Sequence, residues 1–161
     1  MSYKSDFENA SGWSIADTNI KLNTPRGKQF RDYLKQQNVK AIIRYYASTR
    51  RAKTLSLEEA KVISSDGFSI IPVYQDRNRT AADFGRANGK KSAQNALDFA
   101  AYIGQPHGST ILFAVDSDFR DSEVTNSIIP YFRAIKETID NAALRGLSTM
   151  RGSEVLSADS Y

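Results

Sequence analysis

Two aspartates end an apolar stretch, Ile-Leu-Phe-Ala-Val-Asp-Ser-Asp, at residues 111–118. Side chains alternate between the faces of a β-strand, so Asp116 and Asp118 would share a face, about 7 Å apart. Because neighbouring carboxylates repel, one of them is favoured to keep a proton. A protonated carboxyl can donate to a leaving oxygen while an ionised partner stabilises positive charge or positions water, which is the chemistry of glycoside cleavage. The alternative is an aspartate pair that caps a helix or a loop.

Charged side chains also mark two other apolar stretches with the character of strands. Asp17 ends residues 13–18 and is a third candidate catalytic carboxylate, although Asp-Thr-Asn is also good turn chemistry. Arg44 lies inside residues 40–47, where a buried arginine needs a carboxylate partner, and Asp17 or Asp116 would serve. Arg44 is therefore predicted either to orient the acids and contact substrate or to be only their structural counter-ion.

The strand predicted at residues 68–75 ends in Tyr74 and Gln75, and Asp76 follows it. Tyr74 and Asp76 should share one face, and Gln75 should point to the other unless the strand has already ended. An aromatic ring at the end of a strand can stack on a sugar, so Tyr46 and Tyr74 are candidate substrate contacts, together with Gln75 and Asp76. The alternative for such a ring is a place in the core or at the rim.

Four strand-then-helix units must position these residues. Helix N-termini are indicated by Thr24 before Pro25 and by Ser56 three residues before Glu59, which are N-cap and capping-box patterns. Pro130 falls inside the last helix and should kink it or divide it in two. The predicted strands are residues 13–18, 40–47, 68–75 and 110–115, and the predicted helices are residues 25–37, 56–66, 89–103 and 121–143.

This alternation predicts an α/β fold with parallel strands joined by right-handed crossovers. A doubly wound sheet and a (β/α) barrel both fit, but no Gly-x-Gly-x-x-Gly or Walker A loop follows the first strand, which weakens the nucleotide-binding version. We predict a TIM-barrel-like (β/α) domain with only the first four β/α units at residues 12–143. A polar extension at residues 1–11 would precede it, and an irregular tail at residues 144–161 would follow.

Four units cannot close an eight-stranded barrel on their own. The sequence therefore leaves three alternatives for the sheet. The chain could be a fragment of a longer barrel, it could fold as a small open sheet, or it could form a homodimer that covers the open sheet edge.

Composition excludes several classes of protein. The 161 residues include no cysteine, which rules out disulfides and cysteine-based zinc sites. The single histidine, His107, lies in a turn sequence, so a Ser-His-Asp triad could be built only around it. We expect no metal and no cofactor. The net charge of +4 is spread along the chain except at residues 50–53, which we interpret as a solvated loop rather than a nucleic-acid site.

The sequence contains no apolar run of the about 18 residues that a membrane span needs. Residues 1–10 are polar and lack the apolar stretch of a secretory signal. We therefore expect a protein that is made in the cytoplasm and that would reach the cell wall or periplasm by a non-classical route.

Taken together, the stretch of residues 12–139 resembles a glycoside-hydrolase-like domain family formerly catalogued as a domain of unknown function, a relative of the family 25 lysozymes. The order and spacing of several short segments carry this resemblance over about four-fifths of the chain. The segments are Gly-Trp-Ser-Ile-Ala-Asp17, Ala-Ile-Ile-Arg-Tyr-Tyr46, Leu-Ser-Leu-Glu-Glu-Ala60, Gly-Phe-Ser-Ile-Ile-Pro-Val-Tyr-Gln75, residues 89–96, Ile-Gly-Gln-Pro-His-Gly-Ser109 and Ile-Leu-Phe-Ala-Val-Asp-Ser-Asp118.

The resemblance implies a TIM-like barrel and a role in cleaving peptidoglycan, often in bacterial or phage settings. Family 25 lysozymes carry an acid on the first strand and Asp-x-Glu on the fourth. By position, Asp17 matches the first acid and Asp116 the aspartate of the pair, while Asp118 stands in place of the glutamate and is one methylene shorter. A peptidoglycan glycosidase is thus the predicted activity, and the alternatives are a non-catalytic carbohydrate-binding module and an inactive truncated barrel.

Overall fold

The computed structural model describes residues 14–49, 53–77, 79–144 and 155–157, which divide between two compact units. Unit 1 holds the described residues up to Arg44 together with those from 53 to Ile71. Unit 2 holds Tyr45 to Thr49 and the described residues from Pro72 onward. The boundary passes through two strands, so each unit contains a part of both.

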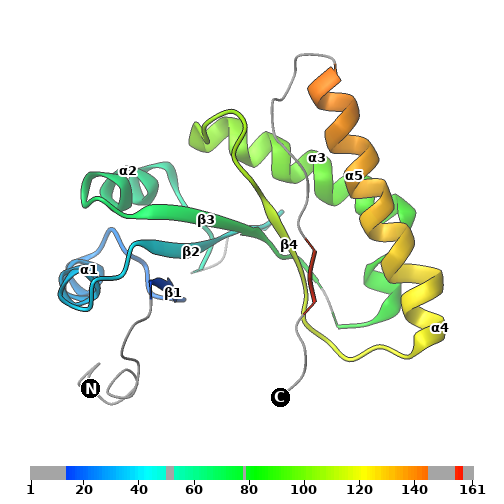
Figure 1. Cartoon of the computed structure of the whole chain (residues 1–161), viewed down its shortest axis with the longest axis horizontal. Coiled ribbons are helices and arrows are strands. Elements are labelled where there is room, and N and C mark those ends of the chain that lie inside the picture. Colours follow the sequence, from blue (N-terminus) through cyan, green and yellow to red (C-terminus); the bar gives the residue numbers. More distant parts are fainter. Residues whose placement is uncertain (1–13, 50–52, 78, 145–154, 158–161) are drawn as a thin grey trace. The chain divides into compact units, whose positions relative to one another are not determined.

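Five strands form one sheet in the order of the chain, β1-β2-β3-β4-β5, and the pairs β1–β2, β3–β4 and β4–β5 are parallel (Figure 1). A doubly wound sheet reverses its strand order at a switch point, whereas a (β/α) barrel keeps the chain order. The α/β, TIM-barrel-like fold with its first four β/α units is therefore confirmed. The strands are β1 (Ile15–Asp17), β2 (Ala41–Tyr46), β3 (Ser69–Tyr74), β4 (Leu112–Val115) and β5 (Val155–Ser157).

The helices follow the strands as the sequence predicts, and their first residues are capped by the expected side chains. Thr24 Oγ1 accepts a hydrogen bond from the Gly27 N–H at 3.0 Å, and Ser56 Oγ accepts one from the Glu59 N–H at 3.2 Å. The helices are α1 (Pro25–Gln36), α2 (Leu57–Ser65), α3 (Arg86–Ile103), α4 (Asp121–Glu123) and α5 (Ile129–Leu144), with a 3₁₀ turn at Ala81–Asp83 in the loop before α3.

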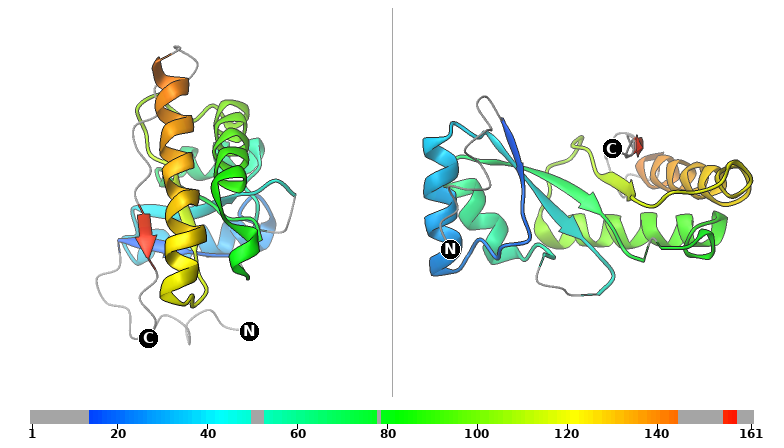
Figure 2. Two further views of the ribbon diagram at one scale, coloured as in Figure 1. Left: turned by 90° about the vertical axis from the view of Figure 1, so that its right-hand side faces the viewer. Right: turned by 90° about the horizontal axis from the view of Figure 1, so that it is seen from below.

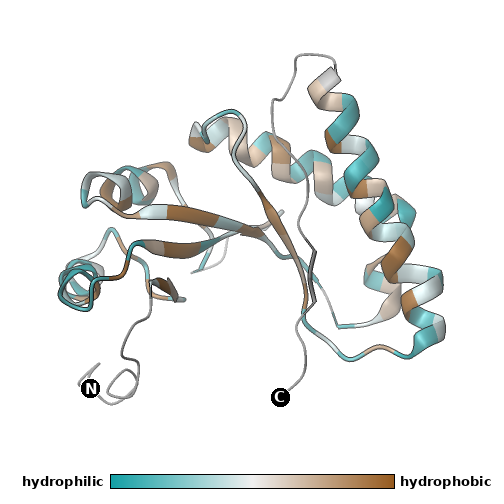
Figure 3. Cartoon of the chain, viewed as in Figure 1, coloured by the Kyte–Doolittle hydropathy of each residue, from teal (hydrophilic) through white to brown (hydrophobic). Residues whose placement is uncertain are grey.

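In unit 1, an ion-pair group joins the two helices beside a small apolar core. Asp66, which caps the C-terminus of α2, accepts from Arg31 Nε at 2.5 Å and from Lys35 Nζ at 2.8 Å, both on α1. These hydrogen bonds hold the pKa of the Asp66 carboxyl below its ordinary value. The buried apolar side chains of this unit include Leu22, Phe30, Leu34, Ile42 and Ile63. The strands are among the most hydrophobic segments of the chain (Figure 3).

Pro130 divides the last helix, as predicted. Between α4 and α5 the backbone forms a π-helical turn at Val124–Ile128, where the Ile129 N–H donates to the Val124 carbonyl five residues back. Proline has no N–H to continue an α-helical ladder, so the turn before it is free to take the wider hydrogen-bond pattern. The Ser127 carbonyl in this turn accepts from the Gly85 N–H at 3.1 Å, which ties the helix to the residue just before α3.

In unit 2, helices α3 and α5 lie side by side (Figures 1 and 2). The contact face of α3 is built from small buried residues, Gly89, Ala93, Ala96 and Ala100, and Ala134 of α5 is also fully buried. A Cβ atom placed on Gly89 would lie 2.3 Å from the Tyr131 carbonyl oxygen. Helix α3 begins at Arg86 and not at residue 89 as predicted, so Gly89 lies inside the helix, where it makes room for α5.

The stretch after residue 143 contains one strand that the sequence pattern does not predict. Strand β5 pairs in parallel with β4, with Val155 opposite Phe113 and Ser157 opposite Val115. Three residues are too few for an alternation pattern to show in a sequence, and the pairing comes from the edge of β4. The rest of the predicted tail, residues 145–154 and 158–161, and residues 1–13 with the predicted extension lie outside the described residues, so the predicted domain boundaries stay predictions.

Replacement of Gly89 by alanine tests the α3–α5 contact. In an open helix this change would stabilise by about 1 kcal/mol, because alanine is the better helix former. Here the methyl group meets backbone, so we expect a loss of about 1–3 kcal/mol in the free energy of unfolding, measured by urea denaturation. Lys91→Ala, on an exposed position of the same helix, is the control and should change stability by less than about 0.5 kcal/mol. A stabilised Gly89→Ala protein would contradict the close packing.

Candidate functional site

Unit 2 carries polar side chains at the C-terminal ends of three strands. Asp116 directly follows β4 and is exposed, and its Oδ2 accepts a hydrogen bond of 2.6 Å from Nε2 of Gln75, which directly follows β3. The register pairs Val73 with Leu112. Gln75 comes two residues after Val73 and Asp116 four residues after Leu112, so both side chains project from the same face of the sheet. An exposed carboxylate is thus held in one orientation by a buried amide.

The carboxylate of Asp76 ties the ends of two strands together. Its Oδ1 accepts from the Ser48 N–H at 2.9 Å, beyond the end of β2, and its Oδ2 accepts from the Tyr74 hydroxyl at 2.5 Å. Asn95 Nδ2 of α3 donates to the same hydroxyl at 3.1 Å. Both carboxylate oxygens of Asp76 therefore accept hydrogen bonds within the protein. This network argues against the predicted contact of Asp76 with substrate, which stays a prediction.

Tyr46 and Tyr74 lie in the core of unit 2 and not at its surface; each is 1% exposed. The Tyr46 ring stacks on Phe99 of α3 with centroids 4.5 Å apart, and its hydroxyl donates to Gln105 Oε1 at 2.9 Å. The Tyr74 ring lies 5.5 Å from that of Phe113. Burial raises the pKa of both hydroxyls. Because both rings are covered, their predicted stacking on a sugar has no support in this geometry.

A third buried tyrosine, Tyr131 of α5, lies next to this polar network. Burial, as the largest cause, raises the pKa of Tyr131 to about 12, the negative charge of Asp76 adds to the increase, and a hydrogen bond with Ser92 of α3 opposes it. The neutral hydroxyl is therefore the stable form of this side chain inside unit 2.

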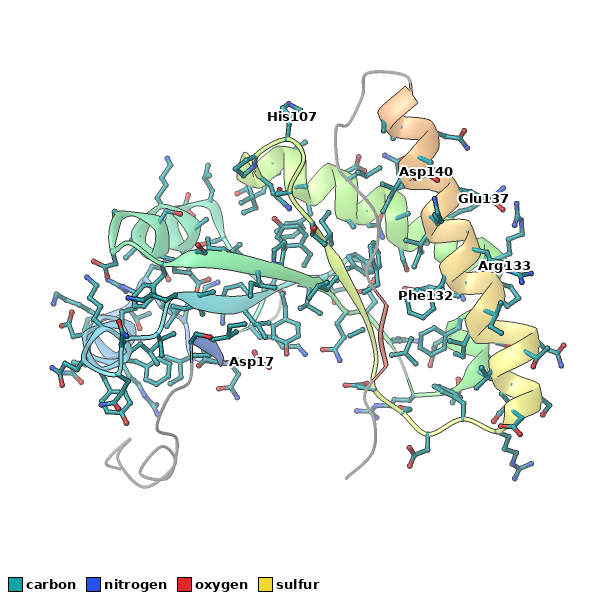
Figure 4. The ribbon with its side chains drawn as sticks, in the orientation of Figure 1. Asp17, His107, Phe132, Arg133, Glu137 and Asp140 are labelled. Carbon is teal, nitrogen blue, oxygen red and sulfur yellow. The ribbon has the colours of Figure 1, made fainter. Side chains whose placement is uncertain are left out.

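In unit 1, Asp17 and Arg44 leave the sheet on opposite faces. Asp17 ends β1 (Figure 4), is exposed, and pairs in register with Ile43 of β2, so the next residue, Arg44, faces the other way. The prediction that Asp17 or Asp116 is the carboxylate paired with Arg44 is therefore corrected. Arg44 Nη2 lies 3.0 Å from Oε1 of Glu59 on α2, and both side chains are fully buried.

Glu59 is the residue that sequence reasoning missed. Its backbone N–H forms one half of the predicted capping box with Ser56, but its carboxylate binds residues outside the helix rather than the N-cap. A signal for this was present in the sequence: Glu59 stands four residues before Ile63 and next to Ala60, on the apolar stripe of α2. An acid on a buried stripe indicates a buried positive partner.

Asp118 lies in the loop after β4. The strand ends at Val115, so the alternation that would place Asp118 on the face of Asp116 does not extend to it. The side chain is exposed and, within the part of the chain that the structure describes, has no hydrogen-bond or ion-pair partner. Its predicted role as a proton donor stays a prediction.

Among the described residues, no three His, Cys, Asp or Glu side chains lie together in a group that could hold a metal ion. Among the same residues, no helix is both long and apolar enough to cross a membrane.

A sheet of parallel strands in chain order, with helices between its strands, defines a (β/α)-barrel-type domain. The chain belongs to the Rv2525c-like, glycoside hydrolase-like domain family, whose model matches residues 32–153.

Three curated relatives are longer than the region they share with this chain. It is 44% identical over 78 residues, 48% of the chain, to the uncharacterized protein YbfG of Bacillus subtilis, and 30% identical over 110 residues, 66% of the chain, to the uncharacterized protein FadG of the same organism. It is 28% identical over 103 residues, 58% of the chain, to a Mycobacterium tuberculosis protein named "Putative peptidoglycan hydrolase Rv2525c". The matches span 11%, 19% and 43% of these relatives.

Solved structures share the fold. The crystal structure of the Mycobacterium tuberculosis Tat-secreted protein Rv2525c in complex with HEPES superposes with a TM-score of 0.59 at 22% identity, covering 81% of this chain and 77% of that one. An uncharacterized protein of B. stearothermophilus superposes with a TM-score of 0.58 at 20% identity, covering 78% of this chain and 55% of that one.

The buried tyrosines predict a loss of stability at alkaline pH. An unfolded tyrosine has a pKa of about 10, whereas burial raises the pKa of Tyr131 to about 12. Above a pH of about 10 the unfolded state therefore binds fewer protons than the folded state. The free energy of unfolding consequently falls as the pH rises. The slope is up to about 1.4 kcal/mol per pH unit for each such group. Tyr131→Phe should reduce this slope between pH about 10 and 12 in urea denaturation, and Tyr102→Phe, at a half-exposed position, should leave it unchanged. Equal slopes in all three proteins would contradict the burial argument.

Proposed function

We propose that this domain is a glycosidase that cleaves bacterial cell-wall peptidoglycan in the manner of a lysozyme. The observation that carries the proposal is the arrangement at Asp116: an exposed carboxylate at the C-terminal end of a barrel-type strand, fixed by a buried amide donor, Gln75. Barrel enzymes place their chemistry at this end of the strands, and glycoside cleavage needs a positioned carboxylate there.

The contacts of Asp116 assign it a role in this proposal. Gln75 Nε2 donates to Oδ2 and holds the carboxylate in one orientation, so Asp116 is the group that stabilises the developing positive charge of the sugar or positions the attacking water. Asp118, which is exposed and two residues further on, is the proton donor to the leaving oxygen. Asp17, exposed at the end of β1 in unit 1, is a further candidate catalytic carboxylate.

The substrate class is supported by the family. A relative carries the name "Putative peptidoglycan hydrolase Rv2525c", and peptidoglycan offers a β-linked polysaccharide whose cleavage uses paired carboxylates. Because the match spans 43% of that relative, its activity enters here as part of the proposal.

A second candidate function is a carbohydrate-binding module without catalysis. The observation that favours it is Asp118, whose side chain is one methylene shorter than a glutamate and has no partner among the described residues to aim it. A proton donor with poor reach would leave sugar binding intact and bond cleavage slow.

The test is release of reducing ends from purified peptidoglycan by the wild type and by Asp116→Asn. The amide keeps the size of the side chain but removes its charge, so we expect activity to fall by at least about 100-fold. The control is Asp140→Asn, which removes an exposed carboxylate on α5 that pairs with Lys136 and should leave the rate unchanged (Figure 4).

Co-sedimentation with insoluble cell wall, measured on the same samples, separates the two functions. Wild-type protein that sediments with the wall but releases no reducing ends would support the binding module. Asp116→Asn protein that hydrolyses peptidoglycan at the wild-type rate would contradict the glycosidase assignment at β4.

A further inference from the structure

The buried carboxylate of Glu59 accepts two hydrogen bonds and forms one further ion pair with two segments of unit 1. Its Oε1 accepts from the Leu22 N–H at 2.8 Å and lies 3.0 Å from Arg44 Nη2, and its Oε2 accepts from Lys21 Nζ at 2.9 Å. Taking a carboxylate out of water is costly unless it is paired and hydrogen-bonded, and Glu59 meets both conditions. A group this costly to bury and this fully paired fixes the position of the segments that it binds.

The segment that Glu59 binds is the loop that directly follows Asp17. Leu22 and Lys21 belong to this loop, and Lys21 Nζ also donates to the Thr54 carbonyl at 2.7 Å, just before α2. The loop is therefore held from α2 at its far end, five residues beyond Asp17.

The near end of the same loop is held by the partner of Glu59. Arg44 Nη1 donates to the Thr18 carbonyl at 2.6 Å, and Thr18 is the residue after Asp17. Thr18 Oγ1 in turn accepts from the Ile20 N–H at 3.0 Å, which makes the beginning of the loop a tight turn. One ion pair, Arg44 with Glu59, thus reaches both ends of the loop.

Arg44 and Asp17 project from opposite faces of the sheet, so this hold on Asp17 acts through the backbone of Thr18. Arginine suits the position because its planar fork can bind a carbonyl with one nitrogen and a carboxylate with another, whereas lysine offers one compact ammonium. The backbone that follows Asp17 is consequently held by a buried ion pair on the opposite face of the sheet.

We infer that Glu59 is a positioning residue: through Arg44 and the Leu22 N–H it fixes the loop of residues 18–22 and so sets the orientation of Asp17 for catalysis. The inference rests on the proposed function, which makes Asp17 a candidate catalytic carboxylate. Glu59 acts on the reaction through other residues and contacts no substrate.

The test combines Glu59→Gln with a matched control, Glu58→Gln. Glutamine keeps the size of the side chain and an oxygen for the Leu22 N–H, but it removes the charge that holds Lys21 and Arg44. We expect amide hydrogen exchange at Ile20 and Leu22, followed by NMR, to speed up by about 10-fold or more, and kcat for peptidoglycan fragments to fall by about 10-fold at unchanged KM. Glu58 is exposed on the same helix turn, and its replacement should change neither.

A change in kcat in protein that still melts cooperatively separates positioning from a general loss of structure. If Glu59→Gln does not fold, Arg44→Lys is the second variant to measure. It keeps the positive charge but loses the planar guanidinium that reaches both Glu59 and the Thr18 carbonyl. Faster exchange at Ile20 and Leu22 with reduced kcat in that variant supports the inference.

Two outcomes distinguish the inference from the function on which it rests. Wild-type exchange and wild-type kcat in Glu59→Gln, alongside an inactive Asp17→Asn variant, overturn the positioning role and leave the proposed function standing. An Asp17→Asn variant as active as the wild type overturns the catalytic assignment of Asp17, while faster loop exchange in Glu59→Gln still establishes that Glu59 holds the loop.

Discussion

Side-chain alternation along the parallel strands is the constraint that sorts the polar residues of this domain. Each strand must bury one face, and on β2 the residues on that face, Ile42, Arg44 and Tyr46, are all almost completely covered. The register then assigns Asp17 to the opposite face, and along β3 and β4 the same rule separates Tyr74 from Gln75 and Asp116. Candidate residues that are equally polar and lie at similar positions in the sequence therefore have different surroundings. Some lie in the protein interior, and others are exposed where the strands end.

Both units use a carboxylate to hold the loop after a strand. In unit 1, Glu59 binds the Leu22 N–H after β1, and in unit 2, Asp76 binds the Ser48 N–H after β2. A loop backbone has no ladder of its own to satisfy its N–H groups, so a side-chain acceptor from a neighbouring element both satisfies the donor and fixes the loop. Two further side-chain donors act beside these loops: Arg44 donates to the carbonyl of Thr18, the residue after Asp17, and Gln75, the residue before Asp76, donates to Asp116.

The family gives this arrangement its context. The chain belongs to a glycoside hydrolase-like family, and it shares the fold of Rv2525c at a sequence identity of 22%. Fold alone does not decide chemistry, because barrel-type scaffolds host many reactions at their strand ends. The chemical argument therefore depends on individual side chains, and Asp116, with its buried amide donor, is the one whose surroundings are most specific.

The sequence by itself determined the order of the first four strands and their helices, the N-caps at Thr24 and Ser56, the division of the last helix at Pro130 and the family, because these depend on local hydrogen bonding, backbone restriction and short motifs. Only the tertiary structure decided the partner of Arg44, the burial of Tyr46 and Tyr74, and the place of Gly89 inside α3. The physical reason is that each of these follows from what a neighbouring element brings to the residue. A carboxylate from α2, a ring from α3 and a backbone carbonyl from α5 are contacts between residues far apart in the chain, and strand or helix periodicity does not encode them.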